Sequence, residues 1–152
     1  MAARVRIPPP LVFLTALLAG IAVQRFAHPL HVPLDRAVAI AVGAAIAAAG
    51  VACVVSARVL FHRTGQNPVP WKPTPELILA GPYRFTRNPM YLGMAGILLG
   101  AAVLMGSLTP FIVIPGFMAL IAERFIVPEE AKLEAAFGRE YLDYKARVRR
   151  WL

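Results

Sequence analysis

Residues 81–106 read GPYRFTRNPMYLGMAGILLGAAVLMG and pass from a polar, aromatic-rich start into a long apolar run. An apolar run of this kind is typical of a helix in a bilayer, where backbone groups must be satisfied within the chain. The side-chain amide of Asn88 stands at the point where the chain would enter the membrane, so it needs a hydrogen-bond partner there. This stretch therefore predicts a membrane boundary, and it raises the question of what function its polar and aromatic side chains have there.

Three further apolar runs accompany it, at residues 11–26, 37–61 and 109–127. The chain has 152 residues, of which 59% are hydrophobic and 16% charged. Such values are typical of a small integral membrane protein, since a bilayer core takes about 20 apolar residues in helical form. We therefore expect an all-α integral membrane protein with about four transmembrane helices.

The runs divide the expected single domain, residues 1–152, into three parts. The first two spans occupy residues 1–61, a proline-rich cytoplasmic loop occupies 62–88, and a helical hairpin with a C-terminal segment occupies 89–152. About two residues join the third and fourth runs, which predicts a tight antiparallel hairpin. Pro115 predicts a bend in the fourth run.

Small residues share one face of the second and third runs: Gly43, Ala47, Gly50, Gly93, Gly96 and Gly100. Small side chains let helices approach closely in a membrane, which predicts close contact for the second run. The glycines of the third run have two interpretations, tight packing or space for a cofactor or a lipid tail.

The basic residues set the expected orientation. Of 16 Lys and Arg residues, only Arg25 and Arg36 lie near the connection between the first two runs. The others lie near the termini or the second connection, as the positive-inside rule requires for cytoplasmic segments. We expect an integral protein of the bacterial inner membrane with both termini in the cytoplasm. Charges in blocks between apolar runs favour a membrane partner and give no indication of nucleic-acid binding.

The C-terminal segment predicts an amphipathic helix with one continuous apolar stripe. Its members are spaced by three or four residues: Leu133, Phe137, Tyr141, Tyr144, Val148 and Trp151. Such a stripe is typical of a helix that lies on anionic lipid headgroups. Gly138 weakens the helix and is a candidate turn.

Two polar clusters are candidates for chemistry, and both map to the cytoplasmic face. One holds Tyr83, Arg84, Arg87, Asn88 and Tyr91, and the other holds Arg124, Glu129 and Glu130. Because the third and fourth spans form a hairpin, we expect the two clusters to be neighbours. The simpler interpretation is membrane anchoring, with the acids paired to the arginines. Pro29 breaks the spacing of His28 and His31, so we expect no metal site.

The pattern GPYRFTRNPMYLG is followed about 40 residues later by Glu129-Glu130, then by Leu, Phe-Gly, Glu-Tyr and a basic end. This combination closely resembles the isoprenylcysteine carboxyl methyltransferase family, whose core the phospholipid N-methyltransferases share. The resemblance covers about residues 75–152. It implies a membrane methyltransferase that uses S-adenosylmethionine in a site built from helices.

The resemblance also implies roles for particular residues. By position, the cofactor contacts fall on Tyr83, Asn88, Pro89, Met90, Tyr91, Glu129 and Glu130, and a substrate-side catalytic arginine falls on Arg124. The guanidinium of Arg87 is a further candidate, because it suits the carboxylate of the cofactor. The segment 75–78 matches a further cofactor-contacting stretch by spacing. The family usually has histidine where this chain has Asn88. Asparagine can form hydrogen bonds but cannot titrate, so a general-base role at this position is excluded.

The expected function is methyl transfer from S-adenosylmethionine to an amphipathic or lipid-soluble acceptor at the cytoplasmic membrane face. The acceptor group is a carboxylate, as in a prenylated cysteine, or a lipid amine or hydroxyl. The alternative is a small non-catalytic four-span protein, either a transporter or an assembly factor. A transporter would carry an ionisable group inside a span, and none of the four runs has one near its centre.

Overall fold

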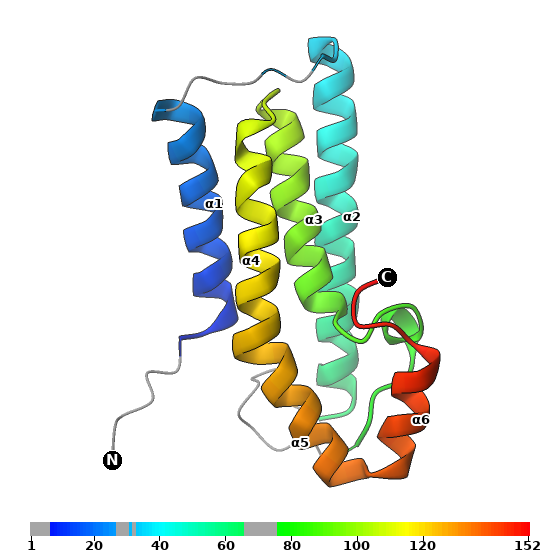
Figure 1. Cartoon of the computed structure of the whole chain (residues 1–152). Coiled ribbons are helices and arrows are strands. Elements are labelled where there is room, and N and C mark those ends of the chain that lie inside the picture. Colours follow the sequence, from blue (N-terminus) through cyan, green and yellow to red (C-terminus); the bar gives the residue numbers. More distant parts are fainter. Residues whose placement is uncertain (1–6, 27–30, 32, 66–75) are drawn as a thin grey trace, which may run out of the picture.

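The computed structural model describes residues 7–26, 31, 33–65 and 76–152 (Figure 1). In chain order the elements are α1 (Pro9–Phe26), α2 (Arg36–Arg63), the 3-10 turn η1 (Gly81–Arg84), α3 (Pro89–Leu104), the 3-10 turn η2 (Thr109–Ile112), α4 (Val113–Ile121), the π-helical turn η3 (Ala122–Ile126), α5 (Val127–Phe137) and α6 (Arg139–Arg147). The described residues form no β-strand, only an isolated bridge between His31 and Ser107. The predicted all-helical class is therefore confirmed.

Four helices lie side by side in the order α1, α4, α3 and α2 (Figure 1). Three helical segments of the described chain are long and apolar enough to cross a membrane: Pro9–Phe26, Arg36–Arg63 and Pro110–Phe137. The third predicted span, α3, has 16 residues, or about 24 Å of helix against a hydrocarbon core of about 30 Å. Since α3 lies between α2 and α4, protein covers much of its surface.

Glycines make the contact between the antiparallel helices α2 and α3. A Cβ atom added to Gly50 would lie 2.6 Å from the carbonyl oxygen of Gly93, and one added to Gly100 would lie 2.6 Å from the backbone nitrogen of Ala47. Side chains do not fit at such distances, so the predicted close contact of the second run is confirmed. For Gly93 and Gly100 the packing interpretation is the correct one, because α2 fills the space beside them.

The fourth run extends further than its apolar residues indicate. It passes without a break through η2, α4 and η3 into α5 and ends at Phe137, ten residues beyond the predicted limit at residue 127. Pro115 lies in the first turn of α4, where a helix does not need its N–H. In η3 the Val127 N–H donates to the Ala122 carbonyl five residues earlier. This wider turn precedes Pro128, whose ring would clash with the Arg124 carbonyl in a regular helix.

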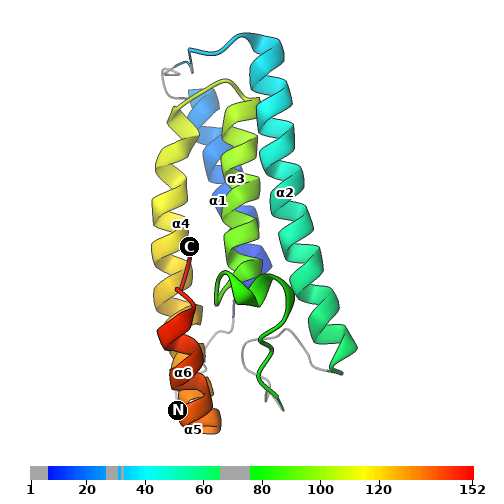
Figure 2. The same cartoon turned by 90° about the vertical axis from the view of Figure 1, so that its right-hand side faces the viewer.

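The C-terminal segment is folded back on itself, so the prediction of one continuous apolar stripe is wrong. Gly138 has φ +50°, a conformation that favours glycine, and it separates α5 from α6. The predicted turn at Gly138 is thereby confirmed. Figure 1 shows α6 running back from the end of α5 and the C-terminal residues returning toward the start of α3, and Figure 2 gives the side view, with α6 in front of α5.

Candidate functional site

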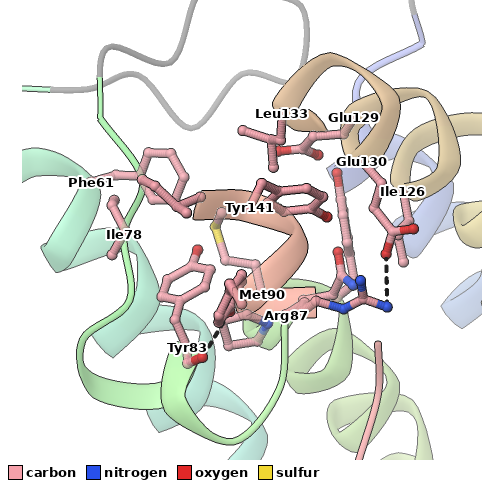
Figure 3. A pocket seen from close by; sticks show the side chains of 15 residues that line it. Phe61, Ile78, Tyr83, Arg87, Met90, Ile126, Glu129, Glu130, Leu133 and Tyr141 are labelled. Atoms are coloured by element: carbon pink, nitrogen blue, oxygen red, sulfur yellow. Dashed lines mark hydrogen bonds and ion pairs between the residues drawn. The ribbon is translucent and has the colours of Figure 1, made fainter. Parts of the chain in front are cut away.

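A cavity lies at the end of the bundle where α2 and α4 end and α3 begins (Figure 3). Its empty volume is about 700 Å³, part of which is continuous with solvent. The side chains around it come from α2, the chain before η1, the start of α3, η3, α5 and α6. Segments far apart in the sequence therefore meet at this one place.

The structure brings eight predicted site residues together around this cavity: Tyr83, Arg87, Asn88, Pro89, Met90, Tyr91, Glu129 and Glu130. The expectation that the two sequence clusters are neighbours is thus confirmed for these residues. Arg124 is different, because it is exposed on η3 and does not line the cavity. Arg84 is exposed as well, and it lies at a separate, shallow surface groove with Arg147.

Several lining residues were not assigned to the site from the sequence: Phe61, Ile126, Leu133, Tyr141 and Tyr144. Tyr141 and Tyr144 belong to the predicted apolar stripe of the C-terminal segment. Their hydroxyl groups could have indicated a place in the site, since a buried tyrosine hydroxyl needs a polar partner. Ile78 was expected from the stretch 75–78, and it lines the cavity together with Leu77. Pro75 and His28 lie outside the described residues.

Glu130 is the centre of a buried ion-pair network. Its carboxylate accepts two hydrogen bonds from Arg150, at 2.7 Å from Nη2 and 3.1 Å from Nε, and lies 3.3 Å from Nη2 of Arg87. The side chains of Arg87 and Glu130 are each 9% exposed, and that of Arg150 is 39% exposed. The predicted pairing of an acid with an arginine is therefore confirmed for Glu130. Two arginines on one carboxylate leave a net positive charge beside the cavity.

Glu129, the next residue on α5, has no such partner. It lines the cavity (Figure 3), and within the described residues its carboxylate takes part in no hydrogen bond or ion pair. Lys132 is the cation that acts on its charge. A half-buried carboxylate without a hydrogen-bond donor is costly, so Glu129 is the group of this pair that is available to a ligand.

Arg87 also has unused hydrogen-bonding groups. Its Nε and Nη1 atoms are buried and have no hydrogen-bond partner among the described residues. Buried donors of this kind cost about 1–3 kcal/mol each when they remain unsatisfied. A ligand with a carboxylate or another acceptor beside Arg87 would satisfy them.

Three tyrosines with neutral hydroxyls surround these charges. Burial raises the pKa of Tyr141 to about 12, and it raises the pKa values of Tyr83 and Tyr144 as well. They remain protonated at neutral pH and can donate hydrogen bonds. The Tyr144 hydroxyl donates to the Tyr83 carbonyl at 2.7 Å, which ties α6 to η1. Phe61 packs against Tyr83 with ring centroids 6.1 Å apart.

Asn88 lines the cavity, and its amide already has a partner. Nδ2 donates to the carbonyl oxygen of Arg150 at 3.0 Å, and the Thr86 hydroxyl donates to the same oxygen at 3.1 Å. The amide that required satisfaction at the membrane boundary is thus satisfied by the C-terminal chain. Through this hydrogen bond, Asn88 holds the C-terminal residues against the start of α3, beside the cavity.

Replacing Asn88 with alanine is expected to lower the free energy of unfolding by about 1 kcal/mol, because one hydrogen bond to the C-terminal chain is lost. Asn88→His is expected to retain most of this energy, since an imidazole N–H can donate to the same carbonyl. Thermal unfolding of both variants in detergent measures the difference. Equal stability of Asn88→Ala and the wild type would contradict the contact.

The fold and the site together define a class: a helical membrane protein with a partly open cavity at one end, where charged and aromatic groups meet. The profile of the phospholipid methyltransferase family matches residues 38–140, about two thirds of the chain. The chain belongs to this family of membrane methyltransferases. The matched region contains every residue that lines the cavity except Tyr141 and Tyr144 of α6.

One further relative is shorter. An uncharacterized protein of Haemophilus influenzae is 40% identical over 63 residues, which are 41% of this chain and the whole of that protein. No solved structure matches the chain. The family therefore supports methyl transfer in general, and the roles of individual residues must be argued from the cavity.

Proposed function

We propose that the protein transfers a methyl group from S-adenosylmethionine to an amphipathic or lipid-soluble acceptor at the cytoplasmic face of the membrane. The observation that carries this proposal is that one cavity holds the Glu129 carboxylate and the Arg87 guanidinium, whose Nε and Nη1 atoms, like that carboxylate, have no hydrogen-bond partner among the described residues. A methyl donor with both a cationic and an anionic end suits this pair.

The chemistry of the lining residues fits the donor in each of its parts. The unsatisfied N–H groups of Arg87 suit its carboxylate, and Glu129 suits its ammonium or sulfonium group or the ribose hydroxyls. Tyr83 and Phe61, with the apolar side chains of Leu77 and Ile78, suit an adenine ring. When bound, S-adenosylmethionine would supply the methyl group itself.

The residues of the chain then have positioning roles. Transfer to an acceptor that is already nucleophilic requires alignment and exclusion of water. The apolar side chains of Ile126, Leu133 and Met90 help to keep water from the cavity. Among the described residues, no serine, cysteine or histidine lines it, and the proposal includes no covalent enzyme intermediate.

The acceptor would come from the bilayer. A lipid tail can lie along the apolar helices while its polar end reaches the cavity, and candidate groups are a carboxylate, as in a prenylated cysteine, or a lipid amine or hydroxyl. Arg124 is exposed on η3, which adjoins the cavity through Ile126. We propose that its guanidinium contacts the acceptor from this outer side.

The membrane arrangement is proposed as four spans in a single domain, with α3 crossing as a protein-covered helix. The ends of the bundle support an inner-membrane orientation with the cavity toward the cytoplasm. Arg58, Arg63 and Arg87 lie at the cavity end, whereas Arg25 and Arg36 lie at the opposite end. The positive-inside rule assigns the first group to the cytoplasm.

Detergent-purified protein is expected to bind S-adenosylmethionine and its product S-adenosylhomocysteine with one site per chain. Isothermal titration calorimetry measures the affinity, and a rise in unfolding temperature with ligand concentration checks it independently. Adenosine and methionine, tested separately, are expected to bind more weakly because each engages only part of the cavity. Folded protein that binds neither donor nor product would instead support the non-catalytic alternative.

A further inference from the structure

The last residues of the chain form part of the cavity's support. We call residues 148–152 the C-terminal strap. Val148 is extended, with φ −119° and ψ 129°, and the strap then runs beside the turn that precedes α3. Trp151 packs against the hydrophobic core that includes Tyr91 and Ile126. An apolar anchor at one end and hydrogen bonds along its length hold the strap in this position.

Arg87 is linked to the strap in two ways, directly through its backbone and indirectly through Glu130. Its backbone N–H donates to the Arg149 carbonyl at 3.0 Å. Its side chain meets Glu130, whose carboxylate is held on its other side by the two hydrogen bonds from Arg150. Thr86 and Asn88, the neighbours of Arg87, both donate to the Arg150 carbonyl.

This geometry decides how Arg87 can use its donors. Arg150 forms a fork with Glu130, so Arg87 contributes only Nη2 to the carboxylate. Without the two hydrogen bonds from Arg150, the Glu130 carboxylate is free to accept two hydrogen bonds from Arg87. Such bidentate pairs are the favoured arrangement of an arginine and a carboxylate. One of the two unpaired donors, Nε or Nη1, would then join Nη2 on Glu130 and be lost to a ligand.

We propose that Arg150 is a positioning residue of the methyl-donor site: by occupying Glu130, it keeps the buried face of Arg87 available for the anionic end of the donor. This inference rests on the proposed function. Arg150 is 39% exposed and does not line the cavity, so its effect must pass through Glu130. The strap thereby makes donor binding depend on residues at the end of the chain.

The test compares Arg150→Gln with Arg149→Gln. The Arg149 side chain is exposed and has no hydrogen bond or ion pair among the described residues, so its replacement is the matched control. In titrations with S-adenosylhomocysteine, Arg150→Gln is expected to weaken binding at least about tenfold, and Arg149→Gln to stay within about twofold. Arg150→Lys keeps the charge but loses the fork, so an intermediate affinity is expected.

A double-mutant cycle with Glu130→Gln distinguishes positioning from general stability. If Arg150 acts through Glu130, Arg150→Gln has little further effect on affinity in the Glu130→Gln protein. Equal losses in both backgrounds would overturn the inference, as would wild-type affinity of Arg150→Gln or, if that variant does not fold, of Arg150→Lys. Failure of the wild-type protein to bind in the same titration would overturn the proposed function and this inference together.

Discussion

We expect replacement of Glu129 with alanine to weaken the binding of S-adenosylmethionine in calorimetric titrations by at least about one to two orders of magnitude, while the protein remains folded. Its carboxylate lines the cavity without a hydrogen-bond partner in the described chain, so the variant removes a ligand contact and leaves no protein group unpaired. Loss of hydrogen bonds to a charged group is worth about 1.5–3 kcal/mol each, which weakens binding by about one to two orders of magnitude.

The unfolding temperatures of the glutamate variants provide a second test. Because Glu129 is half-buried and has no hydrogen-bond or ion-pair partner in the part of the chain that the structure describes, Glu129→Ala is expected to unfold at the same temperature as the wild type or a higher one. Glu130→Ala is expected to do the opposite and lower stability by about 3–5 kcal/mol, since it leaves buried Arg87 without its counter-ion. Glu123 is exposed on η3, and Glu123→Ala should change neither quantity. Wild-type affinity of Glu129→Ala would refute the assigned contact.

The second large effect concerns the contact between α2 and α3. Replacing Gly50 with alanine places a methyl group 2.6 Å from the Gly93 carbonyl oxygen and 2.9 Å from the Ile97 nitrogen, so the two helices must separate. Overpacking against side chains costs about 1–3 kcal/mol, and a contact with backbone should reach or exceed the upper end of this range. Thermal unfolding in detergent, followed by the loss of monodisperse protein, measures the cost.

Gly116 provides the matched control for this substitution. It lies in α4, and a Cβ atom added there meets nothing within 4 Å. Gly116→Ala is therefore expected to leave stability unchanged or to raise it by up to about 1 kcal/mol through helix propensity. Equal effects at Gly50 and Gly116 would contradict the close approach of α2 and α3.

The hydropathy pattern predicted all four long helices, and only for the fourth was the predicted end far from the observed one. It predicted α1, α2 and α3 to within two residues at their ends, because apolar runs bounded by prolines and charges have a direct local cause. It ended the fourth run at residue 127, where the apolar residues give way to Pro128 and charged residues, whereas the helix continues to Phe137. A proline does not interrupt a helix where a π-helical turn already moves the opposing carbonyl aside, and sequence spacing carries no sign of that turn.

Part of the candidate site could also be predicted from the sequence. Tyr83 to Tyr91 and Glu129-Glu130 were predicted to meet because a hairpin brings the start of one helix beside the end of the next. Arg150 and the tyrosines of α6 were not assigned to the site, because their place depends on the reversal at Gly138. The sequence also treated the two glutamates alike, whereas one is paired with arginines and the other is free.

The helical membrane class, the small-residue faces and most of the cavity's charged and aromatic groups could be predicted from the sequence. These features follow from local composition and from spacing along a helix. Three further assignments required the folded structure: Glu130 is neutralised by Arg87 and Arg150, Glu129 faces the cavity without a partner among the described residues, and Asn88 holds the C-terminal strap. Those assignments depend on which distant groups come within hydrogen-bonding distance, and a chain reversal at a single glycine sets that distance.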